Sequence, residues 1–578
     1  MSSTKYWDTW WKRRYARRRV LAGGSVIAAG AAGLALVGCG DDDDDGNDGN
    51  GGTGGDGATA TATATQPPAD QPKAGGILKT AGGPVGSQLD IHKTNTPYES
   101  SGVWHWAGNF LVRFSAYEPN VGLPEADLAE ALPEITDDGT TLIFKLNPAA
   151  TWQNKAPVNG RAVDAEDVKL TFERIMNPDV SSPRAGNYSN IDSIEVVDDH
   201  TVRFRLKAPQ ADLLSAMSDQ YDLIIPKELA ARGADAITGP QDVIGSGPYE
   251  LTSFEAGQRF SLRRRADGYW KPNTAWLDGW DHVNQVDPQQ LSNALRAGEI
   301  DSAGLPVDLV REYEGDPNYY IVSAPNPTRE CVLINHNKEP YTDPKVRQAI
   351  WRAINRTEVF QTVYGGGGIP GGPMTPAAAA WVLPDDELAQ LPGFRDRDTE
   401  LKEAKDLLSA AGYPDGFSDS ILTVTAFNVD EVNDVVVSNL AEVGIRLTTE
   451  NVGTDFFVFL GREVAREYTL ASTLFLSGPY PDAQLFLYHH SQLGSRNYGD
   501  FADEEIDRLL EQQRGIYDME ERLPLVHEIQ RKLIMNPGPA WIGSRVGFSV
   551  IGKHLKNVVA TPFLAGFDDA ENVWIDRG

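Results

Sequence analysis

Short β-rich runs alternate with helices of moderate length along most of this 578-residue chain, and this alternation is what most constrains its fold. The turn Asp137-Asp138-Gly139 precedes a predicted strand over residues 140–146. Residues 191–206 predict a hairpin around Asp198-Asp199-His200. The segments share no fixed repeat period. Mixed elements of this kind predict α/β lobes rather than a helical bundle or a β-sandwich.

Capping residues mark where several helices begin and end. Asp164 is suited to cap a helix, and Asp343-Pro344 is suited to open another, because proline fits the first helical position. A further helix is predicted from about Thr399, and it ends at Gly412, a residue that readily adopts the left-handed conformation. Helices with such defined ends are typical of globular domains.

The first forty residues predict export. A basic segment containing Arg17-Arg18-Arg19 runs into a short Ala/Gly-rich apolar segment that is too weakly hydrophobic for a permanent membrane span. Leu36-Val37-Gly38-Cys39 resembles a bacterial lipobox, in which cleavage before the cysteine leaves Cys39 to carry lipid. We therefore predict a signal peptide over residues 1–38 and anchoring at the outer face of the cytoplasmic membrane. The arginines also resemble the twin-arginine pattern, so both the Sec and the twin-arginine routes stay open.

Residues 39–74 are predicted to form a flexible tether after the lipidated cysteine. The segment contains the acidic run from Asp41 to Asp45 and Gly, Asn, Thr and Ala repeats, and it lacks the large apolar residues that stabilise a fold. An anchored protein needs such a tether if its folded part is to stand clear of the membrane.

Charge and cysteine content exclude some classes of protein. The formal net charge is −30, and residues 1–38 hold seven Lys or Arg and one Asp, so the cleaved product is near −36. A protein this acidic is not suited to bind nucleic acid. The only other cysteine is Cys331, which has no intrachain partner if Cys39 carries lipid, so no disulfide framework is expected.

Several segments, in order, resemble the extracellular solute-binding proteins of the peptide/nickel transporter family (family 5). The match runs from about residue 75 to near the C-terminus. The segments that carry it are Pro124 to Leu132, Asp137 to Thr141, Trp152, Val163 to Val168, Phe172 to Ile175, Gly245-Ser246-Gly247-Pro248-Tyr249, Leu291 to Asp301, Asn335, Asp343 to Ile350, Ala353 to Arg356 and Ala404 to Tyr413.

The resemblance implies an α/β fold of the two-lobed periplasmic-binding-protein type (type II, cluster C), with an extra subdomain in lobe one. We expect lobe one at residues 75–105, 240–325 and 541–578, its extra subdomain at 106–239, and lobe two at 326–540. It also implies a monomeric receptor that closes about a hinge on a small organic solute and delivers it to the permease of an ABC importer. No cofactor or covalent chemistry is required.

The sequence supports an enzymatic function less well than solute binding. Residues 366–371 satisfy a GxGxxG spacing, but they follow a predicted helix and run into Pro373, whereas dinucleotide binding needs a strand before and a helix after. This segment is predicted to be a loop. A secreted hydrolase remains the alternative from another class, although the sequence contains no nucleophile elbow, HExxH or P-loop spacing.

His489-His490 is the only adjacent histidine pair. Neighbouring residues point to opposite sides of a strand, or about 100° apart on a helix, so we expect the two rings not to share one ion. A packed or surface role is favoured over metal ligation, and it stays open whether one of them faces the cleft.

The loop Phe475 to Ala483 is where the resemblance implies ligand contacts from lobe two. Oligopeptide-binding relatives carry there an aspartate that pairs with the peptide's α-amino group, preceded by a tryptophan. Here Pro479 stands in the place of the aspartate and Leu476 in that of the tryptophan. A buried ammonium without a carboxylate costs several kcal/mol, which puts ordinary peptide binding in doubt unless Asp482 substitutes.

The remaining candidates are mainly aromatic side chains that could stack on sugar rings or apolar groups. For Trp104 and Trp106 a buried, structural role is the equal alternative. An oligosaccharide or nickel-chelate receptor of the same fold is therefore the alternative to an oligopeptide-like ligand. The predicted ligand-binding residues are Tyr98, Glu99, Trp104, Trp106, Arg329, Tyr480, Asp482 and Tyr498.

Overall fold

The computed structural model describes residues 71–576 except 84, 95–100, 118–121, 477, 493–496 and 560–570. The compact unit that begins at Pro72 contains two hydrophobic cores. Lobe one gathers buried side chains between Leu78 and Trp280 and between Ile551 and Ile575, and lobe two gathers those between Cys331 and Ile542. The finer lobe boundaries stay predictions. The predicted signal peptide, Cys39 and all of the tether up to residue 70 lie outside the described residues.

A mixed sheet of eleven strands runs through both lobes in the order β15-β14-β16-β12-β17-β11-β1-β10-β9-β8, with β13 paired to β17. Pairs such as β1–β10 are parallel and pairs such as β12–β17 are antiparallel. The strands are β1 (Ile77–Gly82), β8 (Tyr249–Glu255), β9 (Arg259–Arg264), β10 (Gly279–Asn284), β11 (Ser302–Gly304), β12 (Tyr319–Ile334), β13 (Gly368–Pro370), β14 (Phe417–Thr423), β15 (Ile445–Asn451), β16 (Leu470–Leu476) and β17 (Ala540–Gly552).

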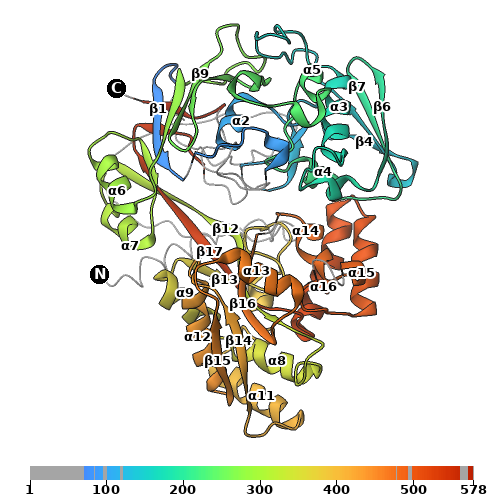
Figure 1. The fold of residues 1–578 in the computed structure, drawn as a ribbon, viewed down its shortest axis with the longest axis vertical. Coiled ribbons are helices and arrows are strands. Elements are labelled where there is room, and N and C mark those ends of the chain that lie inside the picture. Colours follow the sequence, from blue (N-terminus) through green and yellow to red (C-terminus); the bar gives the residue numbers. More distant parts are fainter. Residues whose placement is uncertain are drawn as a thin grey trace, which may run out of the picture. The chain divides into compact units, whose positions relative to one another are not determined.

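Two long strands, β12 and β17, connect the lobes (Figure 1). The first half of β12 pairs with Val546–Gly552 beside lobe one, and from Arg329 onward it pairs with the start of β17 and with β16 in lobe two. The pairing register of β12 with β17 shifts between Pro325 and Arg329. Such irregularities bend a strand and interrupt its ladder of hydrogen bonds. The connection is therefore bent at the boundary between the two lobes.

The predicted turn, strand, hairpin and helix near residues 137–206 are all present. They build a separate four-stranded sheet in the order β4-β5-β7-β6, covered by helix α3. Asp164 accepts hydrogen bonds from the backbone N–H of Glu166 and Asp167, and the Asp167 carboxylate bonds back to the N–H of Asp164, which completes a capping box. The elements are β4 (Glu134–Thr136), β5 (Thr141–Lys145), α3 (Ala165–Met176), β6 (Ile191–Asp198) and β7 (Thr201–Leu206).

The other elements before β12 lie mostly around lobe one. The helices are α2 (Ser101–Ala107), α4 (Leu213–Met217), α5 (Lys227–Ala230), α6 (Pro288–Arg296) and α7 (Val307–Val310), and the short strands are β2 (Val112–Phe114) and β3 (Pro124–Ala126), with β18 (Leu555–Lys556) and β19 (Trp574–Ile575) returning near the C-terminus. The motif Gly245-Ser246-Gly247 packs closely against the C-terminal end of α2. A Cβ at Gly245 would stand 1.8 Å from the Ala107 carbonyl oxygen, which explains why glycine is required there.

Helices after β12 belong to lobe two, the lower part of the view in Figure 1. They are α8 (Pro344–Ala353), α9 (Arg356–Tyr364), α10 (Asp385–Leu388), α11 (Arg397–Ala410), α12 (Val429–Ala441), α13 (Phe456–Ala465), α14 (Pro481–Leu485), α15 (Glu504–Arg514) and α16 (Met519–Met535). Within the described residues, no helix combines the length and apolar character needed to cross a membrane.

Two of the predicted boundaries in lobe two are confirmed and two other predictions need correction. Asp343 caps α8, and Gly412 adopts φ +93° just after α11. Helix α11 begins two residues before Thr399, because Asp396 is the cap and accepts the Thr399 N–H. The segment 366–371 is not wholly a loop: residues 368–370 form β13, which pairs with β17.

Candidate functional site

The two lobes touch directly at one side of the region between them, where α4 of lobe one meets α14, α15 and α16 of lobe two (Figure 1). The Arg522 guanidinium donates to Asp212 Oδ1 over 2.5 Å, and the backbone N–H of Asp482 donates to Asp212 Oδ2 over 2.6 Å. The side chains of Asp212 and Arg522 are 2% and 3% exposed. One carboxylate of lobe one is therefore held by two groups of lobe two.

Further contacts extend this interface along the subdomain. The backbone N–H of Ala211 donates to the carbonyl oxygen of Arg514 over 2.8 Å. The Tyr517 hydroxyl donates to the carbonyl oxygen of Gly139 over 2.9 Å. Because Ala211 and Gly139 belong to lobe one, the interface has several independent polar contacts as well as the buried ion pair.

The predicted ligand residue Asp482 lies within this interface. Its carboxylate accepts hydrogen bonds from Arg514 Nε at 2.7 Å and from Gln513 Nε2 at 2.8 Å. Burial and the neighbouring Asp212 carboxylate raise the pKa of Asp482 to about 6, while Arg514 and Arg522 act in the opposite direction. To pair with a ligand's ammonium, Asp482 would have to share or leave its bond to Arg514.

Tyr480 lies just before Asp482 and is 9% exposed. Burial, followed by the carboxylate of Asp219, raises the pKa of its hydroxyl well above the ordinary value. Asp219 belongs to lobe one, and burial and its neighbour Asp222 raise its own pKa to about 7. Tyr480 and Asp482 are thus brought together, in an acidic environment contributed by both lobes.

A second group, which includes the predicted residues Arg329 and Tyr498, gathers where β12, β16 and β17 meet in lobe two. The Phe475 ring stacks on Tyr498 at 5.9 Å between ring centroids and meets Trp541 edge-on at 5.7 Å. The Arg329 guanidinium lies 3.8 Å from the centroid of Trp541, and burial lowers its pKa to about 10. We call Arg329, Phe475, Tyr498 and Trp541 the aromatic cluster.

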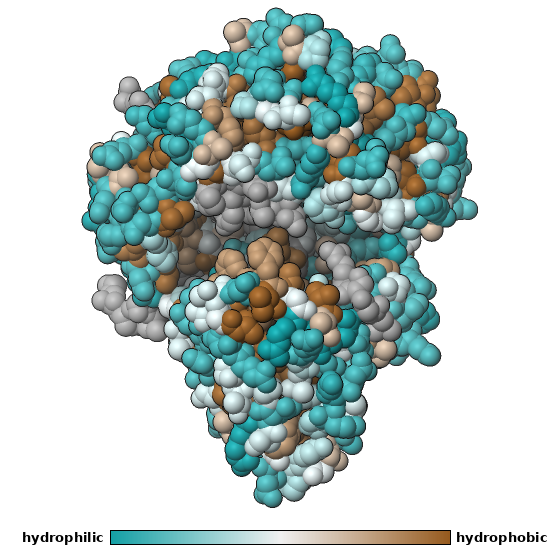
Figure 2. All heavy atoms as spheres, in the orientation of Figure 1, coloured by the Kyte–Doolittle hydropathy of each residue, from teal (hydrophilic) through white to brown (hydrophobic). Residues whose placement is uncertain are grey.

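The aromatic cluster combines apolar ring faces with one cation, and its members differ in exposure. Arg329 and Trp541 are each 1% exposed, whereas Phe475 and Tyr498 are half-buried. Phe475 and Tyr498 are therefore the members able to meet a solute without rearrangement. Figure 2 shows the surface hollowed between the lobes, with apolar side chains on the part of lobe two that faces the hollow.

The two predicted tryptophans lie in the core of lobe one. Trp104 is fully buried and its Nε1 donates to the Leu89 carbonyl oxygen over 2.8 Å. Trp106 is 1% exposed, and its ring lies 4.7 Å from those of both Tyr249 and Trp280. This placement favours the structural alternative for both residues, and a ligand role for them stays a prediction.

Tyr98 and Glu99 lie outside the described residues, so their predicted role also stays untested. Pro479 is buried, and Leu476 is 62% exposed at the end of β16. The residues that sequence reasoning missed are Asp212, Asp219, Arg522 and Trp541. No local signal marks them, because each gains its significance from a partner in the other lobe or in a distant segment.

His489 and His490 lie closer together than expected. Their ring centroids are 4.2 Å apart, and one ring nitrogen of each lies within 4.8 Å of the other and of a carboxylate oxygen of Asp507. The expectation that the rings diverge is wrong, because the pair lies in neither a strand nor an α-helix. His489 is extended, with φ −64° and ψ 143°, between two short 3-10 turns.

Comparison with known proteins gives the family. The model for bacterial extracellular solute-binding proteins, family 5, middle region, matches residues 124–497. Heme-binding protein A of Haemophilus influenzae is 26% identical over 529 residues, which cover 86% of this chain and 92% of that protein. Glutathione-binding protein GsiB of Salmonella typhi is 27% identical over 324 residues, which cover 55% of this chain and 60% of GsiB.

Solved structures share the fold. HbpA2 from Haemophilus parasuis matches with a TM-score of 0.74 and 23% identity, covering 86% of this chain and 100% of that chain. The murein tripeptide binding protein MppA, in its unliganded open form, matches with a TM-score of 0.73 and 18% identity, covering 87% and 97%. The predicted two-lobed type II fold is confirmed.

The family match covers more than half of the chain, and the family is one of extracellular solute-binding proteins. The predicted family and the predicted class of function, solute binding, are confirmed. This chain belongs to the bacterial extracellular solute-binding proteins of family 5.

Proposed function

We propose that this protein is the receptor of an ABC importer, which captures an oligopeptide-like or other organic solute between its lobes and delivers it to the membrane permease. The observation that carries the proposal is the connection between two separate cores by β12 and β17, with a register shift between Pro325 and Arg329. A bent two-strand connection lets each lobe move as a unit while its core stays packed.

Closure is driven by the difference in ligand affinity between the open and closed arrangements. A ligand that moves the open-to-closed ratio from 1:99 to 99:1 must favour the closed form by about 5.5 kcal/mol. Contacts between the lobes, such as Asp212 to Arg522, stabilise the described arrangement of the lobes independently of any ligand contact.

The aromatic cluster supports an organic ligand with flat or apolar faces. Two relatives of similar sequence are named for organic ligands, heme and glutathione. Pro479 in place of an acid argues against strict recognition of a free amino terminus. An oligosaccharide is the second candidate, because the half-buried rings of Phe475 and Tyr498 suit stacking on sugars. A nickel chelate is a third alternative.

Membrane attachment belongs to the same proposal. Lipid on Cys39 would hold the receptor at the outer face of the cytoplasmic membrane after export by the Sec or the twin-arginine route, with the segment up to residue 74 as a tether. We propose that the receptor acts as a monomer, because hinge closure needs only the two lobes of one chain.

Native mass spectrometry of freshly purified protein tests the proposal by identifying a co-purifying solute. Small-angle scattering with and without that solute then measures closure. We expect a smaller radius of gyration in the saturated sample. An unchanged radius with a confirmed ligand would rule out the hinge mechanism, and turnover of the solute on incubation would favour the secreted hydrolase instead.

A further inference from the structure

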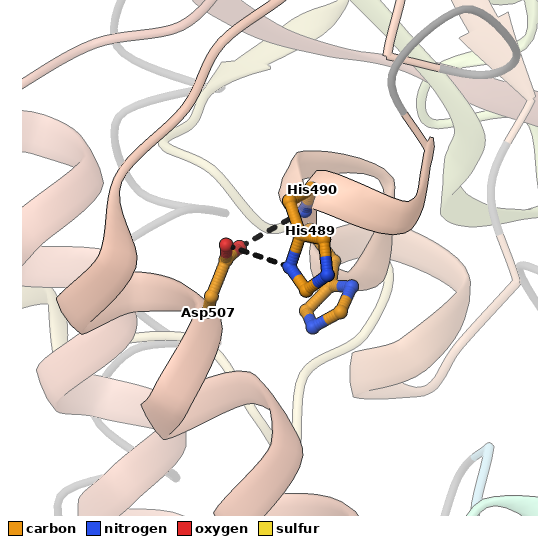
Figure 3. Close-up of side chains that lie close together, drawn as sticks. All are labelled: His489, His490 and Asp507. Carbon is orange, nitrogen blue, oxygen red and sulfur yellow. Dashed lines mark hydrogen bonds and ion pairs between the residues drawn. The ribbon is translucent and has the colours of Figure 1, made fainter.

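We propose that lobe two holds a divalent transition-metal site made by His489, His490 and Asp507. One nitrogen of each imidazole and one carboxylate oxygen of Asp507 lie within 4.8 Å of one another. Figure 3 shows the two rings side by side, with the Asp507 side chain reaching toward them from α15. Ligand atoms around a tetrahedral metal stand about 3.3 Å apart when the bonds are about 2.0 to 2.2 Å, so small side-chain rotations complete the geometry.

Asp507 already orients the exposed histidine. Its carboxylate accepts the backbone N–H of His490 at 3.0 Å and lies 2.9 Å from His490 Nδ1. The His490 side chain is 59% exposed and that of Asp507 15%, so a metal ion can reach the pair from solvent. The same contacts hold the carboxylate and the imidazole together before any ion arrives.

The other histidine is held more rigidly. The His489 side chain is 5% exposed, and its ring stacks on Phe486 with centroids 4.6 Å apart and planes 13° apart. Its Nδ1 lies 2.9 Å from the Ser491 hydroxyl, and its Nε2 lies 3.1 Å from Glu511 Oε1. In metal-binding histidines the nitrogen that does not bind the ion is held by such an oxygen partner, so one of these two contacts can orient the ring while the other gives way to the ion.

Helix α15 supplies a second carboxylate on the same face. Asp507 and Glu511 are four residues apart, so they lie one turn apart and point the same way. The Glu511 side chain is 63% exposed and can turn toward an ion. An open hollow of about 660 Å³ is lined by His490, Asp507 and Glu511 together with Asp503, Glu504 and Arg508, and its charged side chains are mainly acidic. This surrounding charge favours a cation.

The ligand chemistry selects the metal. Two imidazoles with carboxylates suit Zn²⁺, Ni²⁺ and Co²⁺, whereas Mg²⁺ and Ca²⁺ prefer oxygen ligands alone. All the residues named belong to lobe two, so lobe one supplies no ligand to the site. A bound ion would tie the turn that carries His489 and His490 to α15.

The test is calorimetry of the full chain, purified without a histidine tag and stripped with EDTA, titrated with ZnCl₂. We expect one zinc per chain at low micromolar affinity or tighter, and no comparable heat from MgCl₂ or CaCl₂. Co²⁺ should give the visible absorption of a nitrogen-ligated tetrahedral ion. His490→Ala and Asp507→Asn should each weaken zinc binding at least tenfold.

His554→Ala is the matched control, because His554 Nε2 also pairs with a carboxylate, Asp301 Oδ1 at 2.7 Å, but without a second histidine. It should bind zinc as the wild type does. His490 is exposed, so its variant is expected to fold even if a His489 variant does not, and circular dichroism checks this. The proposal is overturned if the wild type takes up no zinc at 100 µM, or if His490→Ala and Asp507→Asn keep wild-type stoichiometry and affinity.

Discussion

Asp212 of lobe one accepts a hydrogen bond from Arg522 of lobe two over 2.5 Å, although the two residues lie 310 positions apart in the chain. Both side chains are almost fully buried. Burying an ion pair is costly, but removing one partner leaves an uncompensated charge and costs more. This relationship makes the arrangement of the lobes sensitive to single substitutions.

The first prediction is that Asp212→Asn shifts the protein toward an open form. Breaking a buried ion pair typically costs about 3 to 5 kcal/mol, and here the loss falls on the arrangement with the lobes together. Small-angle scattering should show a larger radius of gyration.

Glu312→Ala is the matched control for Asp212→Asn. Glu312 forms an ion pair with Arg296 at 2.7 Å, and both side chains are 49% exposed. An exposed pair contributes about 0 to 1 kcal/mol, so this variant should scatter like the wild type. Equal radii for Asp212→Asn and the wild type would contradict the prediction.

The second prediction concerns pH. Burial and Asp212 raise the pKa of Asp482 to about 6, against about 3.9 for a solvated aspartate, so the form with the lobes together binds the extra proton. Protonation of Asp482 therefore stabilises the form with the lobes together relative to the open form. This stabilisation is complete below about pH 4 and is lost as the pH rises through 6. Scattering should show a more compact protein at pH 5 than at pH 8, and a smaller difference in Asp482→Asn. A protein that is more compact at pH 8 would reverse the assigned sign.

The third prediction separates packing from ligand contact. Trp106→Ala removes a buried ring packed on Tyr249 and Trp280 and should destabilise lobe one by about 3 to 5 kcal/mol in thermal unfolding. Tyr498→Ala removes a half-buried ring of the aromatic cluster and should weaken ligand binding roughly two- to tenfold, because such contacts contribute about 0.5 to 1.5 kcal/mol. If Trp106→Ala folds stably but loses binding, Trp106 contacts the ligand.

The fourth prediction concerns the amino end of any peptide that binds. With Pro479 in the loop and Asp482 paired to Arg514 and Gln513, a protonated amino terminus gains no dedicated carboxylate there. Calorimetry on a free and an acetylated peptide should give affinities within a few fold. A loss of tenfold or more on acetylation would show that another acid, with Asp482, Asp219 and Glu99 the first to test, recognises the charge.

The fifth prediction is that Cys39 is the point of membrane attachment. Cys39→Ala can form no thioether, so the protein should be extracted from membranes without detergent, whereas the wild type should require it. Fractionation with immunoblotting measures this, and full retention of the variant in the membrane fraction would refute the lipobox interpretation.

Local features of the fold could be predicted because their physics is local. The capping box at Asp164, the cap at Asp343 and the left-handed Gly412 each depend on side chains within a few residues of the backbone groups they satisfy. The same reasoning placed the start of α11 only at about Thr399, two residues late, because it did not identify Asp396 as the cap.

The candidate site could be predicted only in part. The loop that carries Tyr480 and Asp482 came from the family resemblance, and the structure places it in the interlobe contact. Arg329 was a candidate from the sequence alone, and it lies in the aromatic cluster. Sequence could not show that Trp104 and Trp106 are buried, because aromatic residues serve cores and binding surfaces equally well.

The sequence by itself determined the class of fold, the family and the short-range caps and turns, because each of these follows from periodicity, motif order or contacts between neighbouring residues. Only the tertiary structure decided which distant groups meet. Asp212 pairs with Arg522 because β12 and β17 carry the two lobes to face each other, and His489 and His490 converge on Asp507 because an irregular turn packs against α15. Such meetings depend on the relative placement of whole elements, which no local pattern encodes.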